Sequence, residues 1–562
     1  MSPQPIIDVL DVSTLSYEER VVVAAAQGML NRAGPRVFLD YGCYDDPAAR
    51  RTNEVFMDDE HWHGKYRALL GNQDENNLEY YRAAHGFKTR KVRDLESLLR
   101  ANLTAFKGCV VYDDTLPDTI NLAVMLAGLE DLLPLSPALA QRFASLNLPV
   151  RHDLRGRWRN RLAVYAWAFQ HLFPRCKVGQ LACVEPGWGR PEFLDYLVQN
   201  RIFTYSLASS AKGFGATLLL LLSFGPPRLR EALFALGIDR LLSRLALAWM
   251  GAQNKEVALA NRIQRAVKAL PTPTIFGWHT LRDDELAFMF QLSANGLRLV
   301  PSHLAGNFSF HSRVQPLGAF IPDPLPEVTL DPQGVYVTFT LSDGDQLMMM
   351  NTAELGSWRS PARGSVPFNW ECQPLLVEMA PTLLERFTST KTSNDCLIAG
   401  PSGAGYIVPP LAPRFDAYMR ESARVCARAG IRVITSYVAD PPARLLRQLD
   451  RHKGDLLGYL SGYAVVSRAP QTLVNGTPVI ANEIPLAANI WDEPEQIFEH
   501  LQGLIKSSDK TPRFIGVHLF AYRTTLEDVA RFILTHKSEH LHFVRADEFL
   551  IAARQHLQSS HH

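Results

Sequence analysis

The sequence predicts an α/β protein in which N-terminal α/β and helical regions are followed by a C-terminal (β/α) barrel-like domain. Three observations lead to this prediction. The chain opens with alternating strand and helix patterns, residues 151–270 contain almost no strand pattern, and from about residue 271 short apolar strands recur with helical segments between them. Such alternation is typical of parallel strands joined by crossover helices.

Residues 1–150 form the N-terminal α/β region of the prediction. Its first elements are a strand, a helix, two further strands and a second helix, at residues 5–12, 16–32, 36–42, 108–114 and 118–133. Ser16 is a candidate N-cap of the first helix, and Glu19, three residues later, completes the capping-box pattern. The strand at 108–114, GCVVYDD, has the continuous apolar run of a buried strand.

Residues 151–270 are predicted to be mostly helical. The most apolar window of the chain lies here, FGATLLLLLSFG at residues 214–225. A helix that crosses a bilayer needs about 20 apolar residues, so this window is too short to span a membrane. With the following helical segment it could form a hairpin that lies on a membrane, but the charged Asp239, Arg240 and Arg244 favour an ordinary amphipathic helix that packs on the protein.

Residues 271–562 are predicted to form the (β/α) barrel-like domain. Nine segments have the pattern of short buried strands, and most are followed by helical sequence: 274–279, 297–303, 335–343, 365–371, 396–402, 432–438, 456–460, 478–483 and 514–522. About eight strands within this length favour a barrel over an open sheet. We therefore expect most of these segments to lie side by side around one barrel.

Composition excludes several classes of function. Lys and Arg total 58 against 57 Asp and Glu, so no strong field would attract nucleic acid. The seven cysteines include no C-x-x-C pair, which argues against a disulfide framework and a structural zinc site.

The N-terminus lacks the pattern of a signal peptide. We expect a cytoplasmic protein, or a secreted or periplasmic one if a signal peptide has been removed. No cofactor is indicated, and the oligomeric state is open.

The segment GPSGAGYIVPP, residues 400–410, follows one of the predicted barrel strands. It lacks the lysine and hydroxyl residue of a phosphate-binding Walker loop, and Ala404 stands where a nucleophile elbow around Ser402 needs glycine. The glycines permit unusual backbone conformations and the prolines stiffen the turn, so Tyr406 could be held out to a ligand. The alternative is a tight structural turn with Tyr406 packed inward.

Within this segment GAGYIVP, residues 403–409, resembles the signature of the GxGYxYP family of putative glycoside hydrolases, with Val408 in place of the second tyrosine. Further stretches that resemble the family are found along nearly the whole chain, at residues 15–39, 108–139, 149–158, 276–280, 340–347 and 394–406. The resemblance implies an N-terminal α/β portion joined to a C-terminal barrel-like domain. It also implies that the protein cleaves glycosidic bonds.

The segment YVTFTLSDGDQL carries the strongest chemical pattern, because Asp343 and Asp345 stand where a long apolar strand ends. Carboxylates at the carboxyl end of a barrel strand are candidates for catalysis, although Asp343 could instead cap a following helix. Glycoside cleavage needs an acid and a nucleophile or base, and a further carboxylate is expected from another strand. The candidates are Glu371, whose neighbour Trp370 could raise its pKa, together with Asp395 and Glu483.

Aromatic, amide and imidazole side chains near other strand ends are candidates for contacts with a small-molecule or oligosaccharide substrate. Aromatic faces stack on sugar rings, while amides and imidazoles bind hydroxyl groups. The predicted substrate-binding residues are Trp278, His279, Asn307, Trp370, Asp395, Ser402, Tyr406 and His518, with His303 close to them in sequence. Any one of these side chains could also belong to the core.

Two other classes of function stay open. The stretch VTFTLSDGD resembles the T-F-D-D-G segment of polysaccharide deacetylases, in which an aspartate and two histidines hold a divalent cation. The H-x-x-x-H partner of that motif is missing here, so His279, His303 and His518 would have to converge to replace it. The protein would then be a metal-dependent deacetylase or amidase. A non-catalytic carbohydrate- or peptide-binding protein is the third possibility.

Overall fold

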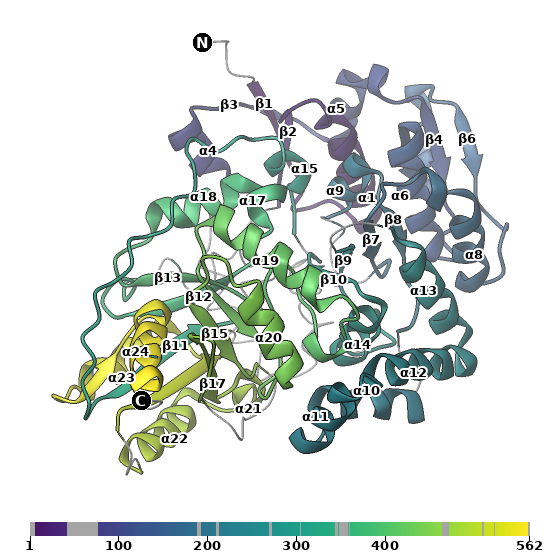
Figure 1. Ribbon diagram of the computed structural model, residues 1–562. Helices are drawn as coiled ribbons and strands as arrows, with labels where there is room; N and C mark the ends of the chain where they lie inside the picture. Colours follow the sequence, from purple (N-terminus) through teal and green to yellow (C-terminus); the bar gives the residue numbers. More distant parts are fainter. Residues whose placement is uncertain are drawn as a thin grey trace.

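The structure is a computed structural model (Figure 1). It describes residues 6–41, 77–187, 191, 193–209, 213–268, 272–303, 305–342, 347, 358, 360–463, 471–507, 511–521 and 523–559. The described residues form three small parallel sheets, a group of helices and a closed barrel of seven parallel strands. The α/β fold class with a C-terminal barrel is thereby confirmed.

The first helix of the chain begins as its sequence pattern predicts. Helix α1, Tyr17–Leu30, has a capping box in which Ser16 accepts from the Glu19 backbone and the Glu19 carboxylate accepts from the Ser16 backbone N–H at 2.9 Å. The helix is buried from Arg20 onward. It packs so tightly on helix α9, Leu194–Asn200, that a Cβ on Gly28 would lie 2.2 Å from the Asp195 carbonyl oxygen. The N-terminal region is therefore joined firmly to the helices that follow it.

Three parallel sheets precede the barrel. The first has the order β2-β1-β3, the second β5-β4-β6 and the third β10-β9-β7-β8. In chain order their bounds are β1 Ile6–Asp11, β2 Val37–Asp40, β3 Lys88–Val92, β4 Gly108–Val111, β5 Leu132–Leu135, β6 Val150–Asp153, β7 Gln180–Cys183, β8 Phe203–Tyr205, β9 Thr274–Gly277 and β10 Arg298–Pro301. Helix α6, Asp118–Glu130, follows β4 as predicted.

The expectation that the strand segments at 274–279 and 297–303 belong to the barrel is wrong. Strand β9 pairs with β7 in parallel, and β10 pairs with β9, so both lie in the four-stranded sheet. Every residue of β9 and β10 is buried, as in the barrel strands. A continuous buried run does not reveal which neighbouring strand it pairs with. The partner strands β7 and β8 have only four and three residues and lie in the region predicted to be mostly helical.

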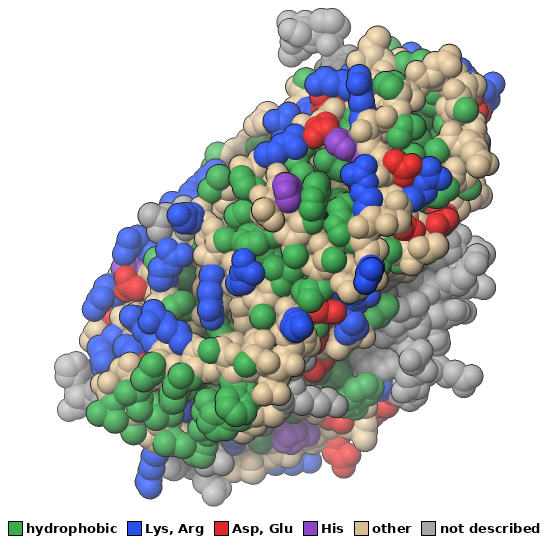
Figure 2. All heavy atoms as spheres, turned by 90° about the vertical axis from the view of Figure 1, so that its right-hand side faces the viewer, with side chains coloured by type: hydrophobic (Ala, Val, Ile, Leu, Met, Phe, Trp, Pro, Cys, Tyr) green, Lys and Arg blue, Asp and Glu red, His purple; other side chains and the backbone are tan. Residues whose placement is uncertain are grey.

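Four helices lie in the chain between strands β8 and β9 of the four-stranded sheet. They are α10 Phe214–Phe224, α11 Pro227–Ala235, α12 Asp239–Gln253 and α13 Lys255–Ala266. Large hydrophobic side chains on α10 to α12 are exposed, among them Phe214, Leu220, Leu229, Leu241, Leu245 and Trp249. Figure 2 shows hydrophobic side chains gathered at the lower end of this side of the molecule, with Lys and Arg side chains above them. Among the described helices, none combines the length and apolar character of a membrane span.

The barrel contains the other seven of the nine predicted strand segments, from 335–343 to 514–522. Its strands follow the order β12-β13-β14-β15-β17-β18-β11, and pairing of β11 with β12 closes it. Their bounds are β11 Val335–Leu341, β12 Phe368–Cys372, β13 Asp395–Ala399, β14 Val433–Ser436, β15 Gly458–Ser461, β17 Thr477–Ile484 and β18 Arg513–Leu519. Two further strands, β16 Gln471–Val474 and β19 Leu541–Phe543, pair with β17 and β11 at the outside of this ring.

Helices cover the barrel between its strands. Their bounds are α17 Leu376–Met379, α18 Pro381–Thr390, α19 Phe415–Ala429, α20 Ala443–Arg451, α22 Pro494–Lys506 and α23 Leu526–Thr535. They alternate with the strands along the chain, which is the arrangement expected of a (β/α) barrel. In Figure 1 this domain occupies the lower left, in green and yellow.

The inside of the barrel is apolar toward the amino ends of the strands. Six of its strands contribute to one buried apolar cluster, with the residues Tyr336, Ile398, Val433, Leu460, Ile480 and Phe514. Helix α24, Ala546–Ser559, adds Phe549 and Leu550 to the same cluster. The seventh strand supplies Asn369, whose amide oxygen accepts from the Ala546 N–H at 2.7 Å. Helix α24 therefore covers this end of the barrel, and only the carboxyl ends of the strands are left to form a site.

Candidate active site

A buried carboxyl group, Glu371, lies inside the barrel near the carboxyl ends of its strands. Its Oε2 accepts from the Ser342 hydroxyl at 3.0 Å, and its Oε1 accepts from the Thr435 hydroxyl. The His518 Nε2 lies 3.6 Å from Oε1, and neither Glu371 nor His518 has any exposed surface. The predicted Glu371 and His518 are thus brought together, from strands that lie far apart in sequence.

The side chains of His518 and Asn482, near the carboxyl ends of the barrel strands, lack hydrogen-bond partners among the described residues. Both side chains are buried, and neither ring nitrogen of His518 nor either amide atom of Asn482 has a hydrogen-bond partner among the described residues. They lie on neighbouring strands, since Asn482 pairs with Gly516 in the register of β17 and β18. Buried polar atoms are nearly always bonded to protein or ordered water. The pair is therefore suited to bind the polar groups of a ligand.

Gly400, the first residue of the glycine-rich segment, makes room for Glu371. A Cβ at this position would lie 1.9 Å from the carboxyl carbon of Glu371. The next two glycines fit the loop against the protein: Gly403 and Gly405 have φ values of 138° and 91°. A Cβ on Gly405 would come within 2.9 Å of the Arg298 side chain. Three glycines are needed here because the loop passes close to a carboxyl group and turns through conformations that other residues rarely adopt.

Tyr406 is packed inward, so the expectation that it is held out to a ligand is wrong. Its side chain is only 2% exposed. Its backbone forms an antiparallel bridge with Leu299, donating to the Leu299 carbonyl at 2.6 Å and accepting at 2.9 Å. Its hydroxyl donates to Glu285 at 2.8 Å. The loop after β13 therefore joins the barrel to the four-stranded sheet, and this tertiary contact buries a residue that local sequence leaves free.

Three tyrosines and a second carboxyl group extend the site. The ring centroids of Tyr406 and Tyr437 are 5.3 Å apart, and those of Tyr437 and Tyr463 are 5.5 Å apart. Tyr463 also contacts the His518 ring at 5.1 Å, and its hydroxyl lies 3.1 Å from that of Ser342. At the other end of the row, burial raises the pKa of Glu285 above its ordinary value. A continuous set of contacts thus links two carboxyl groups, Glu285 and Glu371.

The paired aspartates, Asp343 and Asp345, lie outside the described residues. The residue before them in the chain is Ser342, the hydroxyl donor to Glu371. Sequence reasoning missed Glu285, Tyr437, Tyr463 and Asn482. Tyr437, Tyr463 and Asn482 fall at or just after the ends of predicted strands, so their position was a usable signal. Glu285 lies at the start of helix α14, Glu285–Asn295, and no local signal distinguishes it.

Two of the predicted substrate contacts, Trp370 and Asp395, lie elsewhere. Trp370 is next to Glu371 in β12, so its side chain points to the opposite face of the strand, where it packs outside the barrel against Trp358 and Phe368. Its Nε1 donates to Asp395 at 2.9 Å. Asp395 is the first residue of β13, at its amino end, and forms an ion pair with Arg363. They stabilise the wall of the barrel and do not reach its mouth.

Asn307 and Ser402 are also bonded within the protein. The Asn307 amide oxygen accepts from the Gln27 side chain and the Leu39 backbone at 2.6 and 2.8 Å, and its nitrogen donates to the Leu39 carbonyl at 2.9 Å. Ser402 accepts from the Tyr437 backbone and donates to the Ile407 carbonyl. Asn307 fastens the first sheet of the chain, and Ser402 fixes the glycine-rich loop. Glu483, a further candidate carboxylate, is bound by Arg513 at 2.7 Å.

Trp278 and His279 lie at the carboxyl edge of the four-stranded sheet. With His303 they line a cavity of only about 40 Å³. The rings of Trp278 and His303 stack at 5.1 Å, and burial lowers the pKa of His303 to about 3 and lowers that of His279. Among the described residues no group of three or more His, Cys, Asp and Glu could hold a metal ion. No residue of the barrel strands is among those that line this cavity.

The comparisons with known proteins support this picture of the fold. Residues 333–554 match a model described as the GxGYxYP putative glycoside hydrolase C-terminal domain, and residues 106–176 match the second domain of GxGYxYP_N. A crystal structure of a putative hydrolase from Bacteroides thetaiotaomicron is similar to this one, with a TM-score of 0.74, 16% identity, and coverage of 99% of this chain and 95% of that one. No curated protein matches the sequence. From the two matched segments we conclude that this chain belongs to the GxGYxYP family.

Proposed function

We propose that the protein is a glycoside hydrolase that cleaves a glycosidic bond at the mouth of its barrel. One observation carries the proposal: His518, beside Glu371, and Asn482, on the neighbouring strand, are buried, and the described residues offer their side chains no hydrogen-bond partner. A sugar has hydroxyl groups that both donate and accept, so it matches an imidazole and an amide that need both kinds of partner. The family match supports the same class of substrate.

The chemistry is assigned to carboxyl groups. Asp343 and Asp345, together with Glu371, form the proposed acid/base group, because glycoside cleavage needs one carboxyl group to protonate the leaving oxygen and another as nucleophile or base. The Glu371 carboxyl group is held at both oxygens by hydroxyl donors, so its orientation is set before the substrate binds.

Glu285 is a further candidate for the acid. Burial raises the pKa of this carboxyl group above its ordinary value, and a raised pKa is the property that a general acid needs. The Tyr406 hydroxyl donates to one of its oxygens and fixes its direction. The ring faces of Tyr437 and Tyr463, between Glu285 and Glu371, are suited to pack against sugar rings.

The test is hydrolysis of a panel of aryl glycosides and oligosaccharides by the wild-type protein and by D343N, D345N and E371Q. We expect each substitution to lower kcat by a factor of about 100 or more, as for the loss of an acid or base. E483Q is the matched control, because Glu483 is also a strand-end glutamate but is bound by Arg513. The unfolding temperature of each variant shows whether the fold is retained.

Three outcomes would contradict the proposal. Turnover that survives all three substitutions would place the chemistry elsewhere. Binding of sugars by the wild type without any turnover would favour a carbohydrate-binding protein. Loss of turnover on treatment with a chelator, restored by a divalent cation, would favour a metal-dependent deacetylase or amidase.

A further inference from the structure

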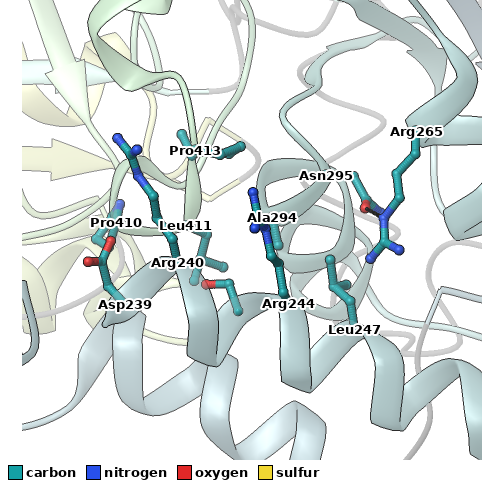
Figure 3. Close-up of a pocket in the computed structure, with 12 residues that line it drawn as sticks. Asp239, Arg240, Arg244, Leu247, Arg265, Ala294, Asn295, Pro410, Leu411 and Pro413 are labelled. Carbon is teal, nitrogen blue, oxygen red and sulfur yellow. Dashed lines mark hydrogen bonds between the residues drawn. The ribbon is translucent and has the colours of Figure 1, made fainter. Parts of the chain in front are cut away.

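A second cavity is lined in part by the end of the glycine-rich segment and by no residue of the barrel strands. Its volume is about 390 Å³, and it is bounded by helix α12, the carboxyl ends of α13 and α14, and residues 410–413. Figure 3 shows Arg240 and Arg244 extending from α12 toward Pro410, Leu411 and Pro413, with Arg265 and Asn295 at the other side. All of the residues that line this cavity belong to the described part of the chain.

Three arginines meet at this cavity without a carboxylate to balance them. Arg240 and Arg244 are four residues apart on α12, and Arg265 comes from the last turn of α13. Within the described residues, no ion pair is formed by any of the three. The lining carboxylate, Asp239, is already held by Arg444 at 2.6 Å. The Arg265 Nε donates to the Asn295 side chain at 2.9 Å, which sets the direction of its guanidinium group.

The arrangement costs stability unless an anion offsets it. Like charges four residues apart on a helix are unfavourable by about 0.2–0.5 kcal/mol. Burial, and the charge of Arg244, lower the pKa of Arg265, which indicates that the positive charges act on one another across the cavity. Arg240, Arg244 and Arg265 are exposed and form no ion pair with the described residues, so their guanidinium groups can bind carboxylate, sulfate or phosphate oxygens in a bidentate manner.

We propose that this cavity is a binding site for a small molecule that carries a carboxylate, sulfate or phosphate group. The guanidinium groups of Arg240, Arg244 and Arg265 bind the anionic group, and the apolar surface of Pro410 and Leu411 packs against the rest of the ligand. A nucleic acid is a poor fit, because the chain carries a net charge of only +1 and the arginines line a cavity of small-molecule size.

Two segments of the chain connect this cavity with the Tyr406–Glu285 contact near the barrel mouth. The 3-10 turn Pro409–Leu411 lines the cavity, and three residues earlier the same loop places Tyr406 against Glu285. Helix α14 also connects the two sites, with Glu285 at its first residue and Asn295 at its last. A ligand in the cavity therefore contacts both segments that hold the Tyr406–Glu285 hydrogen bond.

Direct binding tests the proposal. We would titrate the wild-type protein by calorimetry with inorganic phosphate, sulfate and glucuronate, with glucose as the uncharged control, at constant ionic strength in chloride. We expect at least one of the three anions to bind and glucose not to bind at this cavity. Each charge-assisted contact contributes about 1.4 kcal/mol or more, so R240Q/R244Q should weaken binding by a factor of about 100.

Two further variants make the result specific. R265Q should weaken binding by a factor of about 10, whereas R447Q should leave it unchanged, because Arg447 is exposed on α20 and lies outside the cavity. Circular dichroism confirms that each variant is folded. Absence of binding by all three anions, or equal affinities in the wild type and R240Q/R244Q, would overturn the proposal. The comparison of glucuronate with phosphate and sulfate distinguishes a sugar acid from an inorganic anion as the ligand.

Discussion

The mouth of the barrel and the carboxyl edge of the four-stranded sheet contain the same kinds of side chain but bond them differently. At the barrel mouth, the side chains of His518 and Asn482 are buried and have no hydrogen-bond partner among the described residues. Near the edge of the sheet, Asn307 uses its amide oxygen and nitrogen within the protein, and Ser302 accepts from the Gly277 backbone at 2.7 Å. Closing the barrel makes strand ends converge on an enclosed space, whereas the edge of an open sheet is covered by the chain itself.

The largest effect is expected for G400A, which tests how tightly the barrel mouth is packed. The new methyl group would collide with the Glu371 carboxyl carbon, so the free energy of unfolding should fall by about 3 kcal/mol. Urea unfolding measures this. The matched control is G503A in α22, where a Cβ would meet nothing within 4 Å, and stability should be unchanged or slightly higher. Equal stability of G400A and wild type would mean that Glu371 can move away from the loop.

A smaller loss is expected for N307G, which tests the structural role of a side chain near the four-stranded sheet. The substitution removes three hydrogen bonds to Gln27 and Leu39 while suiting the φ of 62° at this position. Unfolding free energy should fall by about 2 kcal/mol, because buried groups lose their partners. Affinity for a sugar ligand should not change. A stable variant with lost sugar binding would return Asn307 to the substrate site.

H518L should change stability little, by less than about 1 kcal/mol, because it replaces a buried imidazole that has no hydrogen-bond partner among the described residues. Turnover should fall by a factor of about 100. Denaturant unfolding and glycosidase assays on the same sample measure both. A strong loss of stability would show that His518 is a structural residue like Asn307, and the contrast between the two regions would disappear.

The smallest effect is the pH dependence that Glu285 contributes. Because burial raises the pKa of Glu285, the folded state holds its proton more strongly than the unfolded state. The contribution of Glu285 to the free energy of unfolding is fully present below the pKa that Glu285 has in the unfolded chain. This contribution is lost as the pH rises through the higher pKa of Glu285 in the folded protein. E285Q removes that loss, so its unfolding temperature relative to wild type should be higher at pH 7.5 than at pH 4. The same difference at both pH values would exclude a raised pKa.

Much of the barrel was predictable from local pattern. Seven buried runs, from Val335–Leu341 to Arg513–Leu519, became the seven strands, and Ser16 with Glu19 formed the expected cap. A strand that is buried on both faces has a continuous apolar sequence, and a capped helix has a characteristic pair of residues at its start. Both patterns can be recognised within a few consecutive residues. Glu371 and His518 were correctly placed near strand ends for the same reason.

Other expectations failed because they depended on distant parts of the chain. Tyr406 is buried by its pairing with Leu299, more than 100 residues away in sequence. Trp370 faces outward because successive side chains of β12 point to opposite faces and Glu371 points to the inside of the barrel. Strands β9 and β10 have the same buried pattern as the barrel strands and yet belong to another sheet. Partner choice and the direction of a side chain are tertiary properties.

The sequence by itself determined the class of fold, the seven strand segments of the barrel and the family, because periodicity, caps and glycine spacing act over a few residues. Only the tertiary structure decided which strands close into a ring, that Glu371 lies beside His518, and that three arginines line one cavity. The physical reason is that burial and unbalanced charge depend on what the folded chain brings within a few ångströms, which no single segment contains.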